Sequence, residues 1–477
     1  MATKNVFTTH QTCVRVPFSG NVILLCTFFT LLLQFVPVSD LLHLGVFSSR
    51  TTYAARTISP QLMQTEQSII MNIKQNGFNN GAGANNHPGG LWINWLYGSS
   101  PLQTNFDTNG KTDQQQGLPL RHDPLTDIRY LNALWMYKSQ YPTDTQFDDQ
   151  IALYTPIVKL DYAQTDDERG WLYDEEFISL YNLSGDEEYK NDALSLIRAY
   201  SKHFNAQVGT IFRISQAHPH GYYRVDIALE EGCALLQAGT EFNNALWSQQ
   251  GQSIVDFVYQ HAYVAGDHTF PSQMDNVLLN TDKDHPVVNP NETFLLAQSQ
   301  AEGDNNTQGS LFRMGGIAQI ATSLVRVYQV THQEIYLNRA LDLLDALSLP
   351  NNSLGLWDIH NQGYFYGGIF SGSGPSNPGT LTIKADEKEP GRQAAMLIAF
   401  HLANQVTGNR YQDMERQMLA VLLNKAYYAQ GHGVLYEVNP DWSPKVRAGT
   451  PQTWVTTEAM GTMLEALLFL PQSSSAS

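Results

Sequence analysis

Three consecutive acidic residues, Asp174, Glu175 and Glu176, stand beside Trp171 and Tyr173 and are the first candidates for chemistry. Hydrolysis of a glycosidic bond requires one protonated and one ionised carboxyl group. At the start of a helix, the dipole favours the ionised form of one carboxyl, whereas an aromatic wall and a neighbouring charge raise the pKa of the other. This pattern predicts Asp174 and Glu175 as a catalytic pair, with Trp171 and Tyr173 contacting the substrate. Alternatively, Asp174 caps a helix and the glutamates lie in its first turn.

A second pair of carboxylates, Asp226 and Glu230, follows a loop that contains His218 and His220. The spacing of four residues places both carboxylates on one face of a predicted helix, below the loop. We therefore expect His220, Asp226 and Glu230 to bind substrate. The two histidines resemble metal ligands, but no third ligand stands at a characteristic distance, so no metal site is predicted. The alternative is a solvated helix face below a surface loop.

A third group combines aromatic and charged residues in the C-terminal part of the sequence. Aromatic faces stack on sugar rings, while carboxylate and guanidinium groups bind sugar hydroxyls. This chemistry predicts that the following residues bind a carbohydrate: Trp357, Asp358, His360, Arg392 and Trp454. In the alternative interpretations the aromatic residues only pack the loops, or His360 is a catalytic base.

The composition excludes several classes of function. With 45 acidic and 28 basic residues the formal charge is -17, which would repel nucleic acid and anionic lipid. The sequence contains no dinucleotide-binding glycine motif, no phosphate-binding loop, no nucleophile elbow and no Cys-x-x-Cys motif, so no cofactor is predicted. The three cysteines exclude a disulfide-scaffold protein.

The N-terminal region predicts a membrane segment. Lys4 and Arg15 occur without any acidic residue, and an apolar run follows at residues 22–38, extending weakly to about residue 46. This order is typical of a signal anchor or an export signal. We expect residues 1–58 to form a cytoplasmic tail, a membrane helix and a linker, which places the remainder outside the cytoplasm. If the signal is cleaved, the protein is secreted; a buried N-terminal helix is the third interpretation.

The elements that must position these side chains are helical hairpins. Residues 179–200, 324–347 and 399–422 each read as a helix end, a short polar turn with Gly or His, a Tyr and a second helix. Weaker copies occupy residues 130–151 and 230–259, and residues 455–470 predict a terminal helix. Repeated hairpins form an open solenoid or a closed ring. Long, irregular, aromatic-rich loops favour the ring, with a site at the end where the loops gather.

These hairpins resemble the six-hairpin, or (α/α)6, glycosidase-like superfamily, from Thr57 to the C-terminus. The segment GWLYDEEFISLYNLSGDEEY, residues 170–189, looks like the paired-carboxylate segment of the endo-α-1,6-mannanases of glycoside hydrolase family 76. In that family two adjacent Asp precede a helix, and Glu175 stands here at the second position. Residues 354–368 look like a loop of the N-acylglucosamine 2-epimerase group, whose histidines transfer protons.

The resemblance implies an all-α (α/α)6 toroid over residues 59–470, with a disordered tail at residues 471–477. It also implies a carbohydrate-active glycosidase that works outside the cytoplasm through Asp174 and Glu175. One alternative is a sugar epimerase or isomerase in which His220 and His360 act as acid and base. Another is a glycan-binding envelope protein without catalytic activity.

Overall fold

The computed structural model describes residues 59–80, 89–106, 111–116, 122–162, 169–280, 282, 284–295, 310–447 and 450–470. The predicted membrane segment and the predicted tail at residues 471–477 lie outside these ranges. None of the described helices is both long and apolar enough to cross a bilayer.

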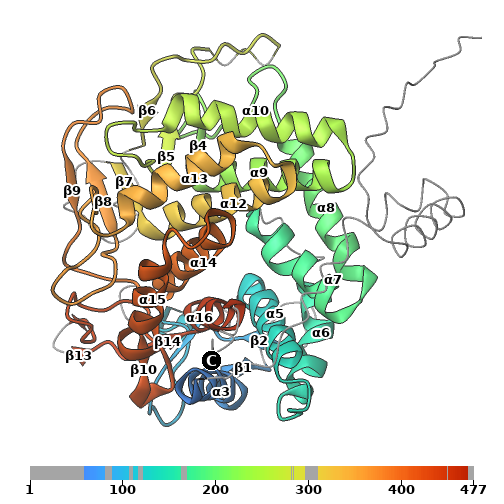
Figure 1. Cartoon of the computed structure of the whole chain (residues 1–477), viewed down its shortest axis with the longest axis vertical. Coiled ribbons are helices and arrows are strands. Elements are labelled where there is room, and N and C mark those ends of the chain that lie inside the picture. Colours follow the sequence, from blue (N-terminus) through green and yellow to red (C-terminus); the bar gives the residue numbers. More distant parts are fainter. Residues whose placement is uncertain are drawn as a thin grey trace, which may run out of the picture. The chain divides into compact units, whose positions relative to one another are not determined.

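Two concentric sets of helices form the described domain (Figure 1). Along the chain, an outer helix alternates with an inner one. The outer helices are α3 (Pro60–Asn72), α6 (Asp148–Tyr162), α8 (Glu187–His203), α10 (Ala245–Ala262), α13 (Glu334–Leu347) and α15 (Gln412–Val421). The inner ones are α5 (Pro124–Gln140), the π-helical segment η2 (Leu172–Ile178) continued by α7 (Ser179–Ser184), α9 (Val225–Glu241), α12 (Met314–Thr331), α14 (Pro390–Thr407) and α16 (Thr457–Phe469). Because outer and inner helices alternate in direction, the inner helices begin at the same end of the ring.

The turns within the hairpins explain the repeated sequence pattern. Gly185, His332 and Gly408 each end a helix in the left-handed conformation, with φ of 76°, 55° and 67°. This conformation lets the backbone N–H of the cap reach back to the last turn of the helix. The Tyr that follows each turn is buried and fastens the second helix: Tyr189, Tyr336 and Tyr411. The five predicted hairpins and the terminal helix are confirmed.

The first and last described helices complete the ring. Helix α16 packs against α5, α14 and α3 (Figure 1). Asn72 at the end of α3 donates to the backbone oxygens of Gly431, at 2.9 Å, and His432, at 3.0 Å. The hairpin pattern identified no sixth pair because its two helices lie at opposite ends of the sequence.

Short strands modify the all-α prediction, which is correct only as a mostly helical fold. Strands β4 (Tyr222–Arg224), β7 (Ser310–Arg313) and β14 (Trp454–Thr456) run directly into the inner helices α9, α12 and α16. Their antiparallel partners are β5 (Gln273–Asp275), β8 (Gly367–Phe370) and β3 (Asn94–Leu96). Pairing satisfies the backbone groups of loops that fold over one end of the ring. The remaining strands are β1 (Phe78–Asn79), β2 (Gly90–Leu91), β6 (Thr293–Phe294), β9 (Leu381–Ile383), β10 (Tyr427–Tyr428), β11 (Gly433–Val434), β12 (Val446–Arg447) and β13 (Thr450–Pro451).

Candidate functional site

A charged cavity lies where the inner helices begin, and it has a volume of about 180 Å³. Every one of the six inner helical segments contributes to its wall, either from its first turns or from the residues just before it. The carboxylates among the described lining residues are Asp123, Asp226, Glu230, Glu389 and Glu458. The arginines are Arg129, Arg169, Arg224, Arg313 and Arg392. Such a set of charges suits a small polar ligand better than an apolar one.

Helix α9 supplies two carboxyl groups in different surroundings. Asp226 forms an ion pair with Arg224, whose Nη2 lies 2.7 Å from Oδ2, and accepts the backbone N–H of Ile227 at 2.9 Å. Glu230 lies one turn further along, with 4% of its surface exposed. Burial raises the pKa of Glu230 well above its ordinary value, and the charges of Asp226 and Glu175 raise it further. Glu230 therefore keeps its proton at a pH where an exposed glutamate has lost it.

Across the ring, α14 and α16 present a second carboxyl pair around Arg392. Its Nη2 lies 3.1 Å from Oε1 of Glu458, and its Nε lies 3.6 Å from Oε2 of Glu389. The Arg392 charge lowers the pKa of Glu458, whereas burial raises the pKa of Glu389. Carboxyl groups whose pKa values move in opposite directions are what acid and base catalysis needs.

Gly170 brings Trp171 to the cavity wall. A Cβ atom at position 170 would lie 2.1 Å from the backbone oxygen of Glu230, so any other residue would push η2 away from α9. The guanidinium carbon of Arg129 lies 4.1 Å from the centre of the Trp171 ring. Trp171 therefore lines the cavity, and its predicted contact with substrate stays a prediction.

The predicted catalytic pair lies deeper in the ring, outside the residues that line the cavity. Asp174 forms an ion pair with Arg326 of α12 and accepts the side-chain N–H of Gln237 at 3.2 Å. Burial raises the pKa of Glu175, although Arg326 and Arg129 act in the opposite direction. The cavity-lining Gln319 hydrogen-bonds to Glu175, so this carboxyl lies near the cavity. The catalytic role of the pair stays a prediction.

Glu176 belongs to the same deep layer. Nε of Arg129 lies 3.0 Å from Oε1 of Glu176 and 2.8 Å from Oε2 of Glu465 in α16. Nearby, Tyr173 donates its hydroxyl proton to Glu241 and is fully buried. These contacts join η2, α5, α9 and α16.

The residues predicted near positions 357–360 lie in a separate loop. Burial acts to raise the pKa of Asp358, but Lys388 at 2.8 Å and the N–H groups of Asn361 and His360 lower it to about 2. Trp357 is buried beside Tyr364, whereas His360 is exposed. Neither Trp357, Asp358 nor His360 lines the cavity, and their substrate contacts stay predictions.

The remaining predicted residues divide between surface and packing. His220 is exposed, and Trp454 is buried and stacked on Phe106 with ring centres 5.0 Å apart. Of the predicted site residues, the cavity brings together Trp171, Asp226, Glu230 and Arg392.

Sequence reasoning missed most of the charged lining, including Asp123, Glu389 and Glu458. These three residues stand at or beside the first residues of α5, α14 and α16. A comparison of the starts of the inner helices, in place of the hairpin turns, would have aligned them. The signal in the sequence was therefore an acidic residue at the start of each of these inner helices, and not a motif.

A second cavity of about 320 Å³ adjoins the first and shares Arg224 and Ile227 with it. Its wall also contains Phe212, Tyr222 and Tyr223, which makes it more aromatic than the central cavity. Together the two cavities offer a charged position next to an aromatic one.

Solved structures with 14% sequence identity or less share this fold. An unsaturated glucuronyl hydrolase from Bacillus sp. GL1 is similar with a TM-score of 0.54 at 14% identity, over 86% of this chain and 95% of the other. A family 76 glycoside hydrolase from a bovine Bacteroides thetaiotaomicron strain has a TM-score of 0.54 at 11% sequence identity, over 87% of this chain and 78% of the other. A D-mannose isomerase has a TM-score of 0.52 at 12% sequence identity, over 88% of this chain and 100% of the other. No protein-family model and no curated protein sequence matches the chain. The likeness shows the six-hairpin toroid fold.

Proposed function

We propose that this six-hairpin chain is a glycosidase that cleaves a glycosidic bond in the central cavity, with Glu230 as general acid and Asp226 as its carboxylate partner. The observation that carries the proposal is the contrast within α9. Glu230 is buried with a raised pKa, whereas Asp226 is held in an ion pair by Arg224. Such a contrast is the usual arrangement for glycoside hydrolysis.

In the proposed reaction, Glu230 donates its proton to the oxygen of the leaving group as the bond from that oxygen to the anomeric carbon breaks. Asp226 accepts a proton from water as the water oxygen bonds to the same carbon. The products are two free hydroxyl-bearing sugars, and proton exchange with solvent restores both carboxyl groups. No residue outside the cavity takes part in this sequence.

The arginines support an acidic sugar as the substrate. Five guanidinium groups line about 180 Å³, and guanidinium binds carboxylate or sulfate with two parallel hydrogen bonds. Among the structurally similar proteins are hydrolases named for a glucuronyl group, which is an acidic sugar. The aromatic second cavity offers space for the neighbouring unit of the substrate.

The test compares two pairs of isosteric variants on oligosaccharides that carry a uronic acid and on neutral α-1,6-mannan. We expect Glu230→Gln and Asp226→Asn each to lower kcat/KM by about 10² to 10⁴. Asp174→Asn and Glu175→Gln test the pair predicted from the sequence, and Glu187→Gln, an exposed residue of α8, is the control.

Loss of activity in Asp174→Asn and Glu175→Gln, with activity kept in Glu230→Gln and Asp226→Asn, would overturn the assignment in favour of the deeper pair. Equal turnover in all five variants would exclude both pairs. A parent protein that binds the acidic oligosaccharide by calorimetry without cleaving it would instead be a glycan-binding protein.

We also propose that the domain acts outside the cytoplasm on a retained membrane anchor. The support is the apolar run at residues 22–38, with its weak extension to about residue 46, after Lys4 and Arg15. The full-length protein should remain with membranes after an alkaline carbonate wash, and a chain starting at Ser59 should be soluble and helical. Release of the full-length protein by the wash would contradict the anchor.

A further inference from the structure

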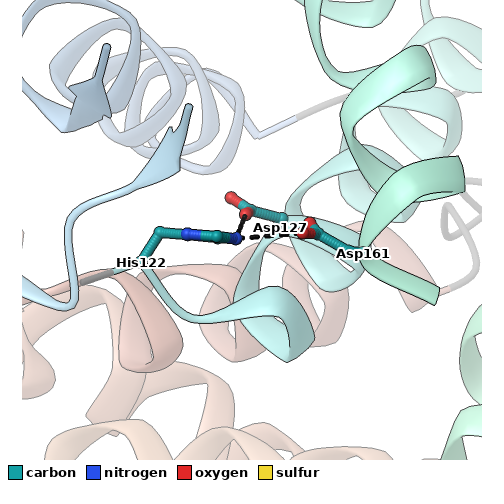
Figure 2. Close-up of side chains that lie close together, drawn as sticks. All are labelled: His122, Asp127 and Asp161. Atoms are coloured by element: carbon teal, nitrogen blue, oxygen red, sulfur yellow. Dashed lines mark hydrogen bonds and ion pairs between the residues drawn. The ribbon is translucent and has the colours of Figure 1, made fainter. Parts of the chain in front are cut away.

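Three side chains converge outside the cavity, between α5 and the end of α6 (Figure 2). His122 precedes α5, Asp127 lies in the first turns of α5, and Asp161 lies near the end of α6. Nε2 of His122 is 2.9 Å from Oδ1 of Asp161 and 3.8 Å from Oδ2 of Asp127. One nitrogen and two carboxylate oxygens all lie within 4.8 Å of one another.

The carboxylate of Asp127 is fixed on one side only. Its Oδ1 accepts the backbone N–H of Leu91 at 2.7 Å. Its Oδ2 is buried and accepts no hydrogen bond within the described residues. A Cβ atom at position 90 would lie 2.4 Å from this oxygen and 2.6 Å from the His122 ring, so only Gly fits beside the two side chains. A buried oxygen without a donor is costly, and a cation would remove that cost.

The charges of the cluster also favour a cation. The side chains of Asp127 and Asp161 are 0% and 2% exposed, and the charged groups acting most strongly on Asp127 are two acids, Asp161 and Asp123. Two buried carboxylates in contact repel each other unless a positive charge or a proton lies between them. The imidazole of His122, which contacts both carboxylates, is the third potential ligand of such a cation.

The separations fit a tetrahedral ion. Zinc bonds of about 2.1 Å to nitrogen and oxygen place neighbouring ligand atoms roughly 3.4 Å apart. The separations from Nε2 of His122, 2.9 Å and 3.8 Å, lie within about 0.5 Å of this value, and the two carboxylate oxygens lie within 4.8 Å of each other. The His122 side chain is 14% exposed, which gives the ion and a water ligand access from solvent.

We propose that His122, Asp127 and Asp161 bind one divalent transition-metal ion, for which zinc is the best fit. The site is structural, because it joins the segment before α5, α5 itself, α6 and, through Leu91, strand β2. Asp123 lies between the ligand His122 and α5, caps that helix and lines the cavity. The ion therefore fixes one part of the cavity wall without contacting the substrate.

A proton is the competing occupant. Burial raises the pKa of Asp127 well above its ordinary value, and Asp161 raises it further. A proton shared between the two carboxyls would satisfy both without a metal. The two occupants are distinguished by whether the protein binds zinc through these residues.

The test uses the full chain after treatment with a chelator. Calorimetric titration with ZnCl2 should show that the parent binds one zinc ion per chain and that the variants bind it more weakly. The thermal unfolding of the parent should shift to higher temperature with ZnCl2 but not with MgCl2. Asp161→Asn, which keeps the shape of the side chain, and His122→Gln should each weaken zinc binding at least tenfold. Circular dichroism establishes that each variant is folded.

Glu415→Gln is the matched control. His401 and Glu415 form another histidine–carboxylate pair, with Nδ1 3.0 Å from Oε1. This pair contains only one carboxylate, and its other oxygen accepts a hydrogen bond from Asn404. This variant should bind zinc as the parent does. The proposal is overturned if the folded parent binds no zinc, or if Asp161→Asn and His122→Gln both bind it with the affinity of the parent.

Discussion

Two layers of carboxylates share the centre of the ring, and they differ in what surrounds them. In the upper layer, Asp226, Glu230 and Glu458 face a cavity at the starts of the inner helices. In the deep layer, Asp174 and Glu176 are held by the arginines of α12 and α5. Ion pairs occur in both layers, but only the upper groups also border a cavity that a ligand can enter.

The difference teaches that charge density alone does not identify a site. Both layers are rich in carboxylates and arginines, but only the upper one combines them with open volume. A buried ion pair between helices fixes their relative position, and removing one partner leaves an uncompensated charge. We therefore expect deep-layer variants to affect stability and upper-layer variants to affect activity.

The strongest test of the deep layer removes Arg326. Arg326→Met leaves the largely buried Asp174 without its ion-pair partner, so the free energy of unfolding should fall by about 3 kcal/mol. Adding Asp174→Asn should recover most of this loss because the unpaired charge is then gone. Urea unfolding of the two single variants and the double variant gives the coupling directly. Additive effects would show that the two side chains act independently.

The upper layer is tested by Glu458→Gln. The Arg392 charge lowers the pKa of Glu458, so the amide removes a negative charge that the cavity normally contains. We expect kcat/KM to fall by about 10 to 100-fold, with a change in unfolding free energy below about 1 kcal/mol. Steady-state kinetics and urea unfolding on the same preparation separate the two effects. A stability loss as large as that of Arg326→Met would erase the distinction between the layers.

The dependence of stability on pH tests a carboxyl of the deep layer. Burial, and then Asp174, raise the pKa of Glu241 from 4.5 to about 7. Because the folded state holds this proton more tightly, its contribution is fully present below pH 4.5 and is lost as the pH rises through 7. Compared with Glu241→Gln, the parent should lose about 3 kcal/mol over this range, because each pKa unit corresponds to about 1.4 kcal/mol. Parallel stability curves for parent and variant would refute the raised pKa.

The smallest effects are expected outside both layers. His220 and His360 are exposed, so His220→Ala and His360→Ala should change the unfolding free energy by less than about 0.5 kcal/mol. The proposed glycosidase activity should stay within about twofold of the parent, since neither residue lines the cavity. A loss of sugar isomerisation in either variant would instead support the epimerase interpretation.

The fold followed from the sequence because each hairpin carries its own local signals. A polar turn at Gly185 or Gly408 and a buried Tyr after it are determined by neighbouring residues. The pairing of α3 with α16 was not predictable in this way because it depends on closure of the whole ring. Short strands such as β4 were not predicted for a similar reason, since their partner strands lie in distant loops.

Four residues of the cavity wall were predicted from the sequence: Asp226 and Glu230 by their spacing on one helix, and Trp171 and Arg392 by their residue types. Asp226 and Glu230 stand one turn apart, and their spacing revealed them. Glu389 and Glu458 come from different hairpins, and only the ring brings both beside Arg392. Conversely, Asp174 and Glu175 were predicted as a catalytic pair because they are adjacent acids. Adjacency in the sequence does not show how far along the ring axis the two side chains lie.

The position of α16 in the ring has a consequence for how the chain folds. Arg129 of α5 donates to Thr462 of α16 across 333 positions of sequence. During synthesis, α16 leaves the ribosome after every other helix of the ring. The apolar surfaces of α5, α14 and α3 that pack against α16 therefore stay exposed until then. Contacts of such long sequence separation form slowly, and the exposed surfaces favour association between unfinished chains. The ring therefore closes only once α16 has been synthesised, because α16 covers the flanks of α5, α14 and α3.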